Sequence, residues 1–371
     1  MKFKIQQSEL GKALANVASI VPAKTTMPIL TCILVNATED TITFSATNLD
    51  LSVTTKTTEA TIETPGKVAI PAQKFVSFVK SLYQGEVVVE VDNNNLSVKC
   101  GKAGLTESVM NVDEFPALPE TGDNEGHKIN TDLLSSMIKS TAYAVSKDET
   151  RPALMGILWE IKPTSLAMIA TDAHRLSKVE ASFDWGVTEI KDIITDTAGL
   201  LHFARLAEGE KEGTVFINDK QLSFQTGNTV LHTRLHDGPF PDYTAVIPQG
   251  NNMKVIADRD QFMSGVRRVS ITADRITSQI RIGLDKGKLE MSATGTDGSK
   301  AQDEMAVSFD GDAMEIGFNY SYLLDVLKNI DAEEIEISVK DSQSAALLAP
   351  VSEDKKTDLL CLLMPLRLSS D

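Results

Sequence analysis

The chain alternates between two spacings of hydrophobic and polar positions. Apolar residues stand three and four positions apart in the stretches "QSELGKALANVASIV", "NTDLLSSMIKSTAYAV" and "ADRDQFMSGVRRVSI", which predicts amphipathic helices. The N-caps of these helices would be Ser8, Asp132 and Asp258. Apolar and polar residues alternate instead in "TITFSAT" and "GEVVVEVDNNNLSVKC", which predicts antiparallel strands joined by Asn, Asp and Gly turns.

This pattern occurs three times along the chain. Similar runs begin at Phe44, Met168 and Glu290, and their shared Ala-Thr pairs are 124 and then 123 residues apart. A short strand followed by a helix recurs at a similar offset in "KVAIPAQKFVSFVKSLYQG", "DIITDTAGLLHFARLAEG" and "MEIGFNYSYLLDVLKNI". Each copy closes on a proline motif, which is "FPALP", "FPDYTAVIP" or "MPLRL". Three separate markers at one period indicate an internal repeat.

The repeat predicts three similar domains of about 120 residues each. Polar, turn-rich connectors occur at "LPETGDNEGH" and "IPQGNNM", so we expect domains at residues 1–120, 121–247 and 248–371. Each domain would contain two helices packed on antiparallel sheets, which is an α+β fold.

Composition narrows the class of protein. The chain has 371 residues, of which 42% are hydrophobic, and its apolar runs are shorter than the roughly 18 residues of a membrane helix. The N-terminal "MKFKIQQSELGKAL" lacks the apolar core of a signal peptide, so we expect a cytoplasmic protein with no membrane partner. Cys32, Cys100 and Cys361 fit no disulfide framework and no zinc spacing, so we expect neither a metal site nor a cofactor.

The net charge of −16 argues against nucleic acid, because duplex DNA is bound through Lys and Arg side chains. The charge is unevenly distributed, however: the predicted helices and their flanking turns hold 13 basic and nine acidic side chains. The solvated faces of amphipathic helices would account for any single basic residue. If the helices of all domains face one way, they would form a mildly positive surface that attracts DNA without reading its bases. The candidate DNA-facing residues are Lys24, Lys74, Lys80, Lys139, Lys147, Arg151, Arg205, Arg267, Arg268 and Arg275.

Geometry limits how such domains could surround DNA. A domain of this length has a diameter of about 35 Å, so three touching domains leave a hole of only about 5 Å, and six leave one of about 35 Å. B-DNA is roughly 20 Å across. A single chain could not encircle it, whereas two chains joined head-to-tail could close a ring around it.

The segment "TDAHRL" places Asp172, His174 and Arg175 within four positions, a combination that also occurs in hydrolase active sites. The equivalent loops of the other copies, "ATNLDLS" and "ATGTDGS", lack histidine. A His-Asp pair without a nearby nucleophile or metal ligand is a weak indication of catalysis. A hydrolase that uses Asp172 and His174 is one alternative function, and a monomeric scaffold of three repeats is another.

These features resemble the bacterial sliding clamp family, the beta subunits of DNA polymerase III. The resemblance covers the whole chain, and its most specific pieces are "TDAHRL", "FPDY", "MEIGFNYSYLLDVL" and "MPLRL". It implies a ring-shaped head-to-tail homodimer that encloses double-stranded DNA without sequence preference, with helices lining the hole. It implies a processivity factor in DNA replication that has no catalytic activity of its own. The implied partners are the catalytic subunit of DNA polymerase III, the clamp loader and other proteins that carry a clamp-binding motif.

The family has a pocket for short partner peptides between its second and third domains. Carried over by motif, this pocket would comprise Leu154, Thr171, Ala173, His174, Arg175, Leu176, Pro241, Val246, Asn319, Tyr322, Ser344, Leu362, Met364, Pro365, Leu366 and Arg367. The tail "LLCLLMPLRLSSD" fits this role: Leu359 to Leu363 would form a last core strand, and Met364 to Leu368 could reach the pocket. Methionine suits a site that accepts varied peptides, because its side chain repacks readily.

The chain departs from the family pattern at three points. Ala173 stands where the family usually has glycine, Leu366 replaces the second methionine of "MPMRL", and Ser369 to Asp371 extend the tail. The resemblance also places the contact between the two subunits near Leu105 in the first domain and Ile271 in the third.

Overall fold

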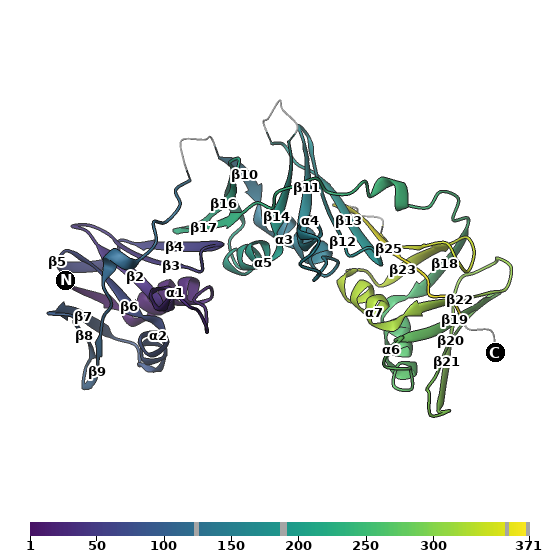
Figure 1. Cartoon of the computed structure of the whole chain (residues 1–371), viewed down its shortest axis with the longest axis horizontal. Coiled ribbons are helices and arrows are strands. Elements are labelled where there is room, and N and C mark those ends of the chain that lie inside the picture. The colour runs from purple at the N-terminus through teal and green to yellow at the C-terminus, as the bar shows by residue number, and fades with distance from the viewer. Residues whose placement is uncertain (122–125, 186–190, 353–355, 369–371) are drawn as a thin grey trace. The chain divides into compact units, whose positions relative to one another are not determined.

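The computed structural model of the chain describes residues 1–121, 126–185, 191–352 and 356–368, so the tail extension Ser369 to Asp371 lies outside the described residues. The described chain folds into two compact units (Figure 1). The first unit comprises Met1–Ser135 and Ala198–Leu235, and the second comprises Ser136–Thr197 and His236–Asp371. Both units combine antiparallel sheets with a few helices, as the α+β pattern predicted.

The first unit contains two sheets. The five-stranded sheet has the order β5-β1-β7-β8-β9 and is built from β1 (Lys2–Gln6), β5 (Ala60–Thr64), β7 (Glu86–Asp92), β8 (Asn95–Cys100) and β9 (Ala103–Ser108). The eight-stranded sheet has the order β10-β15-β16-β17-β4-β3-β2-β6. Its strands are β2 (Cys32–Ala37), β3 (Ile42–Thr47), β4 (Leu51–Thr57), β6 (Gly66–Pro71), β10 (His127–Asn130), β15 (Glu212–Ile217), β16 (Gln221–Thr226) and β17 (Thr229–Arg234).

The second unit follows the same plan. Its eight-stranded sheet has the order β14-β11-β12-β13-β25-β24-β23-β18, and its four-stranded sheet has the order β21-β20-β19-β22. The larger sheet contains β11 (Gly156–Lys162), β12 (Ser165–Thr171), β13 (Arg175–Ser182), β14 (Lys191–Asp196), β18 (Met253–Asp258), β23 (Glu334–Val339), β24 (Ala346–Val351) and β25 (Thr357–Leu363). The smaller contains β19 (Gln279–Asp285), β20 (Lys288–Thr294), β21 (Lys300–Ala306) and β22 (Met314–Asn319).

The helices pack their apolar stripes against these sheets, as their spacing predicted. In α7, for example, Leu323, Val326 and Leu327 are buried. The longer helices are α1 (Gln7–Ala18), α2 (Ala72–Ser81), α3 (Thr131–Ala142), α5 (Thr197–Leu206), α6 (Arg259–Val269) and α7 (Tyr320–Asn329), with short helical turns at α4 (Pro152–Met155), η1 (Pro28–Thr31), η2 (Val112–Glu114) and η3 (Thr244–Val246). The described helices are all too short or too polar to span a lipid bilayer.

One of the three predicted N-caps is confirmed. The Asp258 carboxylate accepts a hydrogen bond from the backbone N–H of Gln261, but neither Ser8 nor Asp132 is a cap. Helix α1 begins at Gln7, two residues earlier than a cap at Ser8 predicts, directly after β1, where the backbone N–H of Gln7 donates to the carbonyl of Gly85. In α3 the cap is the Asn130 side chain, which accepts from the N–H of Leu133.

Neighbouring repeats share sheets, and this explains why the chain divides into two compact units. Strand β17 pairs with β4 in the first unit, and β25, the last strand of the chain, pairs with β13 in the second. The β25 segment is therefore the core strand that the apolar tail predicted, with Leu362 opposite Leu176. The domain limits at residues 120 and 247 stay predictions, because backbone hydrogen bonds join the repeats across them.

Candidate functional site

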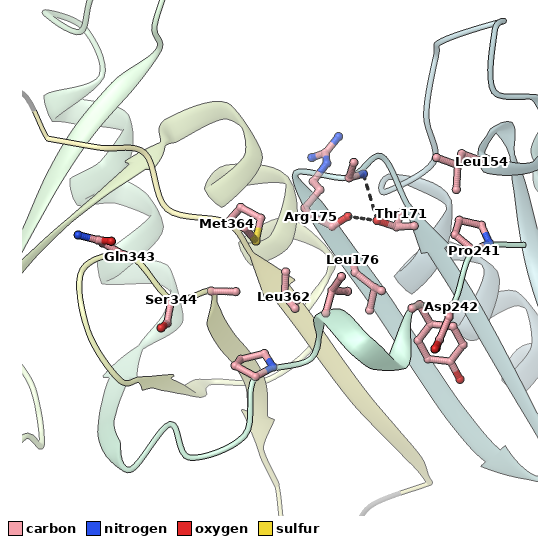
Figure 2. Close-up of a pocket in the computed structure, with 15 residues that line it drawn as sticks. Leu154, Thr171, Arg175, Leu176, Pro241, Asp242, Gln343, Ser344, Leu362 and Met364 are labelled. Atoms are coloured by element: carbon pink, nitrogen blue, oxygen red, sulfur yellow. Dashed lines mark hydrogen bonds between the residues drawn. The ribbon is translucent and has the colours of Figure 1, made fainter.

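A cavity of about 440 Å³ opens where β25 meets β13 in the second unit (Figure 2). Most of its wall is apolar. The lining residues are Leu154, Thr171, Ala173, Arg175, Leu176, Pro241, Asp242, Tyr243, Val246, Pro248, Gln343, Ser344, Ala345, Leu362 and Met364.

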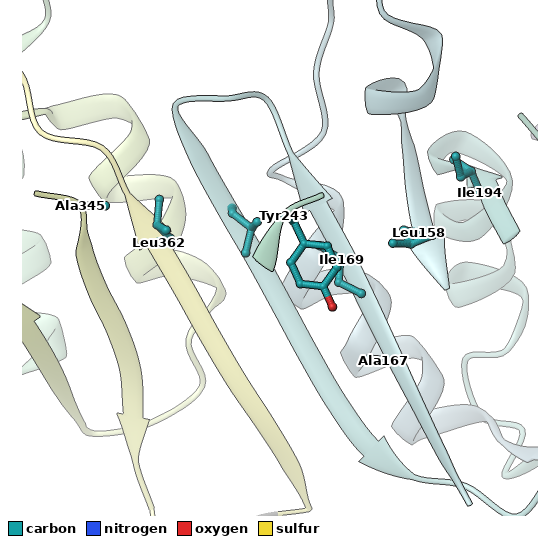
Figure 3. Close-up of a cluster of buried hydrophobic side chains, with 8 residues drawn as sticks. Leu158, Ala167, Ile169, Ile194, Tyr243, Ala345 and Leu362 are labelled. Atoms are coloured by element: carbon teal, nitrogen blue, oxygen red, sulfur yellow. The ribbon is translucent and has the colours of Figure 1, made fainter. Parts of the chain in front are cut away.

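A buried hydrophobic cluster forms the floor of this cavity (Figure 3). Leu176 and Leu362 come from the paired strands β13 and β25, and Tyr243 joins the cluster from the loop that follows Phe240. The Tyr243 hydroxyl donates a 2.9 Å hydrogen bond to Glu160, which anchors the loop to strand β11. Burial raises the pKa of Tyr243 above its ordinary value, so the hydroxyl stays protonated as a donor. The floor is thus fixed before any ligand arrives.

Aspartate side chains hold the loops around the rim. Asp341 accepts hydrogen bonds from the backbone N–H groups of Gln343 and Ser344, and these bonds lower its pKa. Asp242 accepts from both the hydroxyl and the N–H of Thr244, which lowers the pKa of that carboxyl as well. Such side-chain to backbone bonds fix turns at low conformational cost. The rim is therefore largely preformed.

The turn between β12 and β13 uses the same device. The Asp172 carboxylate accepts from the N–H groups of His174 and Arg175, at 2.9 and 3.0 Å, and the Thr171 hydroxyl donates to the carbonyl of Arg175. Between them Ala173 adopts a left-handed backbone with φ of 77°. The turn brings Ala173 and Thr171 onto the cavity wall.

The first repeat contains the same turn with different residues. Asn48 accepts from the N–H groups of Asp50 and Leu51, the Thr47 hydroxyl donates to the Leu51 carbonyl, and Leu49 has a φ of 82°. The conformation therefore belongs to the repeated backbone. What differs in the second repeat is the chemistry of the side chains that the turn carries.

Arg175 is the most heavily engaged of these side chains. Its guanidinium points away from the other labelled residues of the cavity wall (Figure 2), with 9% of the side chain exposed. It contacts Asp172 at 3.1 Å and Asp325 of α7 at 2.7 Å, and it lies over the rings of Tyr143 and Tyr322. The guanidinium tolerates burial because two carboxylates, those of Asp172 and Asp325, pair with its charge.

Asp172 and His174 are both engaged by neighbouring groups in this geometry. The carboxylate of Asp172 is occupied by two amides and a guanidinium, and the His174 ring stacks on Tyr322 with centroids 5.9 Å apart. Within the described residues, His, Cys, Asp and Glu side chains form no group of three that could hold a metal. An apolar cavity with a preformed polar rim is suited to binding extended apolar ligands.

Ten of the sixteen residues predicted for the peptide pocket line the cavity. The other six lie nearby: His174 and Tyr322 stack, Asn319 caps α7, and the remaining three belong to the tail segment Pro365 to Arg367. The N–H of Leu366 donates to the carbonyl of Gly317, so the tail runs along β22 beyond the cavity. The lining residues that the motif transfer missed are Asp242, Tyr243, Pro248, Gln343 and Ala345. The motif "FPDYTAVIP" contains three of these, Asp242, Tyr243 and Pro248, and could have indicated them.

The other predicted sites are placed as follows. All ten candidate DNA-facing side chains are exposed, on helices α2, α3, α5 and α6 or on loops. Lys74 pairs with Glu107 of β9, and Arg268 pairs with Asp303 of β21. Of the two predicted subunit-contact residues, Leu105 lies on β9 and is partly buried, and Ile271 follows α6 and is 83% exposed.

An Ala173→Gly variant is expected to be more stable than the wild type by about 0.5–1 kcal/mol. An L-residue in the left-handed region costs about 1–2 kcal/mol, of which the greater freedom of glycine in the unfolded chain offsets a part. Chemical denaturation would measure the change. The matched control is Ala198→Gly in helix α5, where φ is helical and glycine should lower stability by up to about 1 kcal/mol. A destabilised Ala173→Gly protein would contradict the strain at this turn.

Comparison with known proteins identifies the family. Models of the N-terminal, central and C-terminal domains of the DNA polymerase III beta subunit match residues 1–119, 128–242 and 244–367. The beta sliding clamp of Pseudomonas putida is 30% identical over 370 residues, which is 99% of this chain and 100% of that protein. The sliding clamp of Bacillus subtilis has a similar structure, with a TM-score of 0.93, 28% identity and full coverage of both chains. A sliding clamp of Pseudomonas aeruginosa bound to griselimycin aligns with a TM-score of 0.92, 30% identity, and coverage of 99% and 100%. The repeat, the fold and these full-length matches agree, and the chain belongs to the family of DNA polymerase III beta subunits, the bacterial sliding clamps.

Proposed function

We propose that this sliding clamp acts as a closed head-to-tail homodimer around double-stranded DNA, and that its pocket tethers replication proteins. The observation that carries the ring is a pair of complementary open sheet edges. Strand β9 ends the five-stranded sheet of the first unit, and β21 ends the four-stranded sheet of the second. Open edges offer unpaired N–H and C=O groups to another chain. Pairing β9 of one protomer with β21 of its partner would continue both sheets, and two such contacts close a ring.

Side chains beside these edges support the same contact. Ile271 and Ile276 are 83% and 93% exposed, and isoleucine at this exposure favours burial against a partner. Both lie in the segment that follows α6, whose Arg268 pairs with Asp303 of β21. On the other edge Lys74 pairs with Glu107 of β9, whose Oε2 atom is buried without a hydrogen-bond partner. Each edge thus carries one acidic and one basic side chain. In the dimer, the basic side chain of one edge could pair with the acidic side chain of the other.

The pocket would bind short peptide segments of the DNA polymerase III catalytic subunit, the clamp loader and other clamp-binding proteins. Its apolar walls fit large side chains such as Leu and Phe, each of which contributes about 1.5–3 kcal/mol when buried. Ordering the peptide offsets part of this, so exchangeable binding is expected. Because a Pseudomonas aeruginosa relative is known bound to griselimycin, this compound serves as a probe ligand for the pocket.

The clamp would have no catalytic activity of its own and would act in the cytoplasm. The hydrolase alternative requires Asp172 and His174 to act on a substrate. In the folded chain Asp172 accepts two backbone N–H groups and His174 stacks on Tyr322, an arrangement that favours a positioning role. The net charge of −16 agrees with a ring that holds DNA by topology and attracts it only weakly.

The test of this proposal is retention on DNA of different topology. Clamps loaded on nicked circular DNA are expected to stay bound through gel filtration, and to be lost when a restriction enzyme linearises the circle, because a closed ring slides off a free end. Blocking both ends of the linear DNA with bound protein should restore retention. Equal dissociation from circular and linear DNA would rule out the ring. A chain that sediments as a monomer would favour the scaffold alternative.

A further inference from the structure

We propose that Asp325 is a positioning residue for the ligand pocket: through Arg175 it holds the β12–β13 turn in place against helix α7. Asp325 does not line the cavity, and it lies outside the set of residues that motif transfer assigned to the pocket. The inference rests on the proposed function of the pocket as a ligand site.

The contact joins two elements that are far apart in the sequence. Arg175 begins β13 and Asp325 lies in the middle of α7, 150 residues later, with 2.7 Å between Nη1 and Oδ2. The Arg175 side chain is 9% exposed and that of Asp325 is 34% exposed, so the pair is partly shielded from water. A shielded ion pair of this geometry is stronger than one on the open surface.

The other contacts of these two residues place the pair at the centre of the turn. The backbone N–H of Arg175 and that of His174 bind Asp172, and the Arg175 Nε binds the same carboxylate at 3.1 Å. Asp172 belongs to the same turn as Arg175, so its contact with the guanidinium does not fix the turn to the rest of the unit. Asp325 is an anchor outside the turn, because it stands on a helix whose apolar face is buried.

The anchored turn forms one side of the cavity and supports the other. Ala173 and Thr171 line the wall directly. The carbonyl of His174 accepts a 2.9 Å hydrogen bond from the N–H of Met364, which directly follows β25 and also lines the cavity. A turn released from α7 would therefore displace both walls, and a ligand would have to restore their positions on binding. Lys328 lies 3.7 Å from the same carboxylate but is 51% exposed, so Arg175 is the principal partner of Asp325.

The experiment compares Asp325→Asn, Asp325→Glu and a matched control, Asp331→Asn. Asp331 is exposed just beyond the same helix, so its substitution makes the same charge change away from Arg175. Griselimycin binding is measured by calorimetry. Asp325→Asn is expected to bind about tenfold more weakly than the wild type, which is a usual size for the loss of one strong polar coupling. Asp325→Glu, which keeps the charge, should bind more tightly than Asp325→Asn, and Asp331→Asn should match the wild type.

Hydrogen exchange of the turn distinguishes positioning from a general loss of stability. In the free Asp325→Asn protein, amides of residues 171–175 are expected to exchange faster while those of strands β18 and β23 keep their rates. Wild-type affinity in Asp325→Asn, equal affinity of the Asn and Glu variants, or weaker binding with unchanged exchange of the turn would each overturn the inference. A wild-type protein that fails to bind griselimycin would instead refute the pocket assignment, so the two failures are distinguishable.

Discussion

A Met364→Asp variant is expected to bind griselimycin about 100-fold more weakly than the wild-type protein, because an apolar ligand would desolvate a carboxylate that has no partner. Met364 lines the cavity and is 41% exposed in the free protein, so the substitution should leave folding intact. Val246→Asp, at a residue that also lines the cavity and is 53% exposed, is expected to act in the same way. Calorimetric titration would measure both affinities.

The matched control for these variants is Val351→Asp, at a residue that is 42% exposed on β24 but does not line the cavity. It should retain wild-type affinity. A Met364→Asp protein that folds normally and binds griselimycin as tightly as the wild type would exclude the cavity as the ligand site. Truncation of the tail is a poorer test, because the tail has contacts outside the pocket. The N–H of Leu366 donates a hydrogen bond to the carbonyl of Gly317. Leu368 lines a separate cavity together with Thr277, the residue that follows Ile276. Deleting the tail could therefore disturb self-association as well as the pocket.

The double variant Ile271→Asp, Ile276→Asp is expected to weaken self-association about 1,000-fold. Each isoleucine would lose about 1.5–3 kcal/mol of burial in the subunit contact, and each new carboxylate would add a desolvation cost. At micromolar concentration the protein should then sediment at its chain mass of 40.3 kDa, whereas the wild type should run near twice that mass. Both side chains are exposed in the single chain, so its fold should be unaffected.

Two further measurements test whether the double variant changes only the contact between subunits. The double variant should still bind griselimycin with wild-type affinity, because Ile271 and Ile276 do not line the pocket. It should also be lost from nicked circular DNA, because a monomer cannot enclose the duplex. Val351→Asp serves as the control here too and should remain dimeric. If the double variant still sediments as a dimer, the subunit contact lies elsewhere on the chain.

Local sequence patterns were sufficient for the elements of this fold and for their repetition. The strand and helix in "MEIGFNYSYLLDVLKNI" correspond to β22 and α7. In "GEVVVEVDNNNLSVKC", Asn93 and Asn94 form the turn between β7 and β8. These features are legible because apolar spacing and turn preference depend on neighbours within a few residues. The N-caps were less predictable, since Gln7 satisfies its N–H through Gly85, a contact with a distant strand.

The candidate site was predictable only in part. The motif segments "TDAHRL" and "MPLRL" indicated Leu176 and Met364, and both line the cavity. Gln343 and Ala345 carry no such local signal, because they reach the cavity only through the turn that Asp341 fixes between two strands. The contact between Arg175 and Asp325 has no local signal either, because the two residues are 150 positions apart in the sequence.

The sequence by itself therefore determined the repeat, the α+β class and the apolar last strand, since each follows from short-range periodicity. Only the tertiary structure decided that β25 pairs with β13, and that this pairing opens a cavity beside Met364. Strand pairing depends on backbone hydrogen bonds between distant segments, and many partners would satisfy the same alternation of apolar and polar residues. The choice among them is made by the packing of the whole unit, and the pocket is a consequence of that choice.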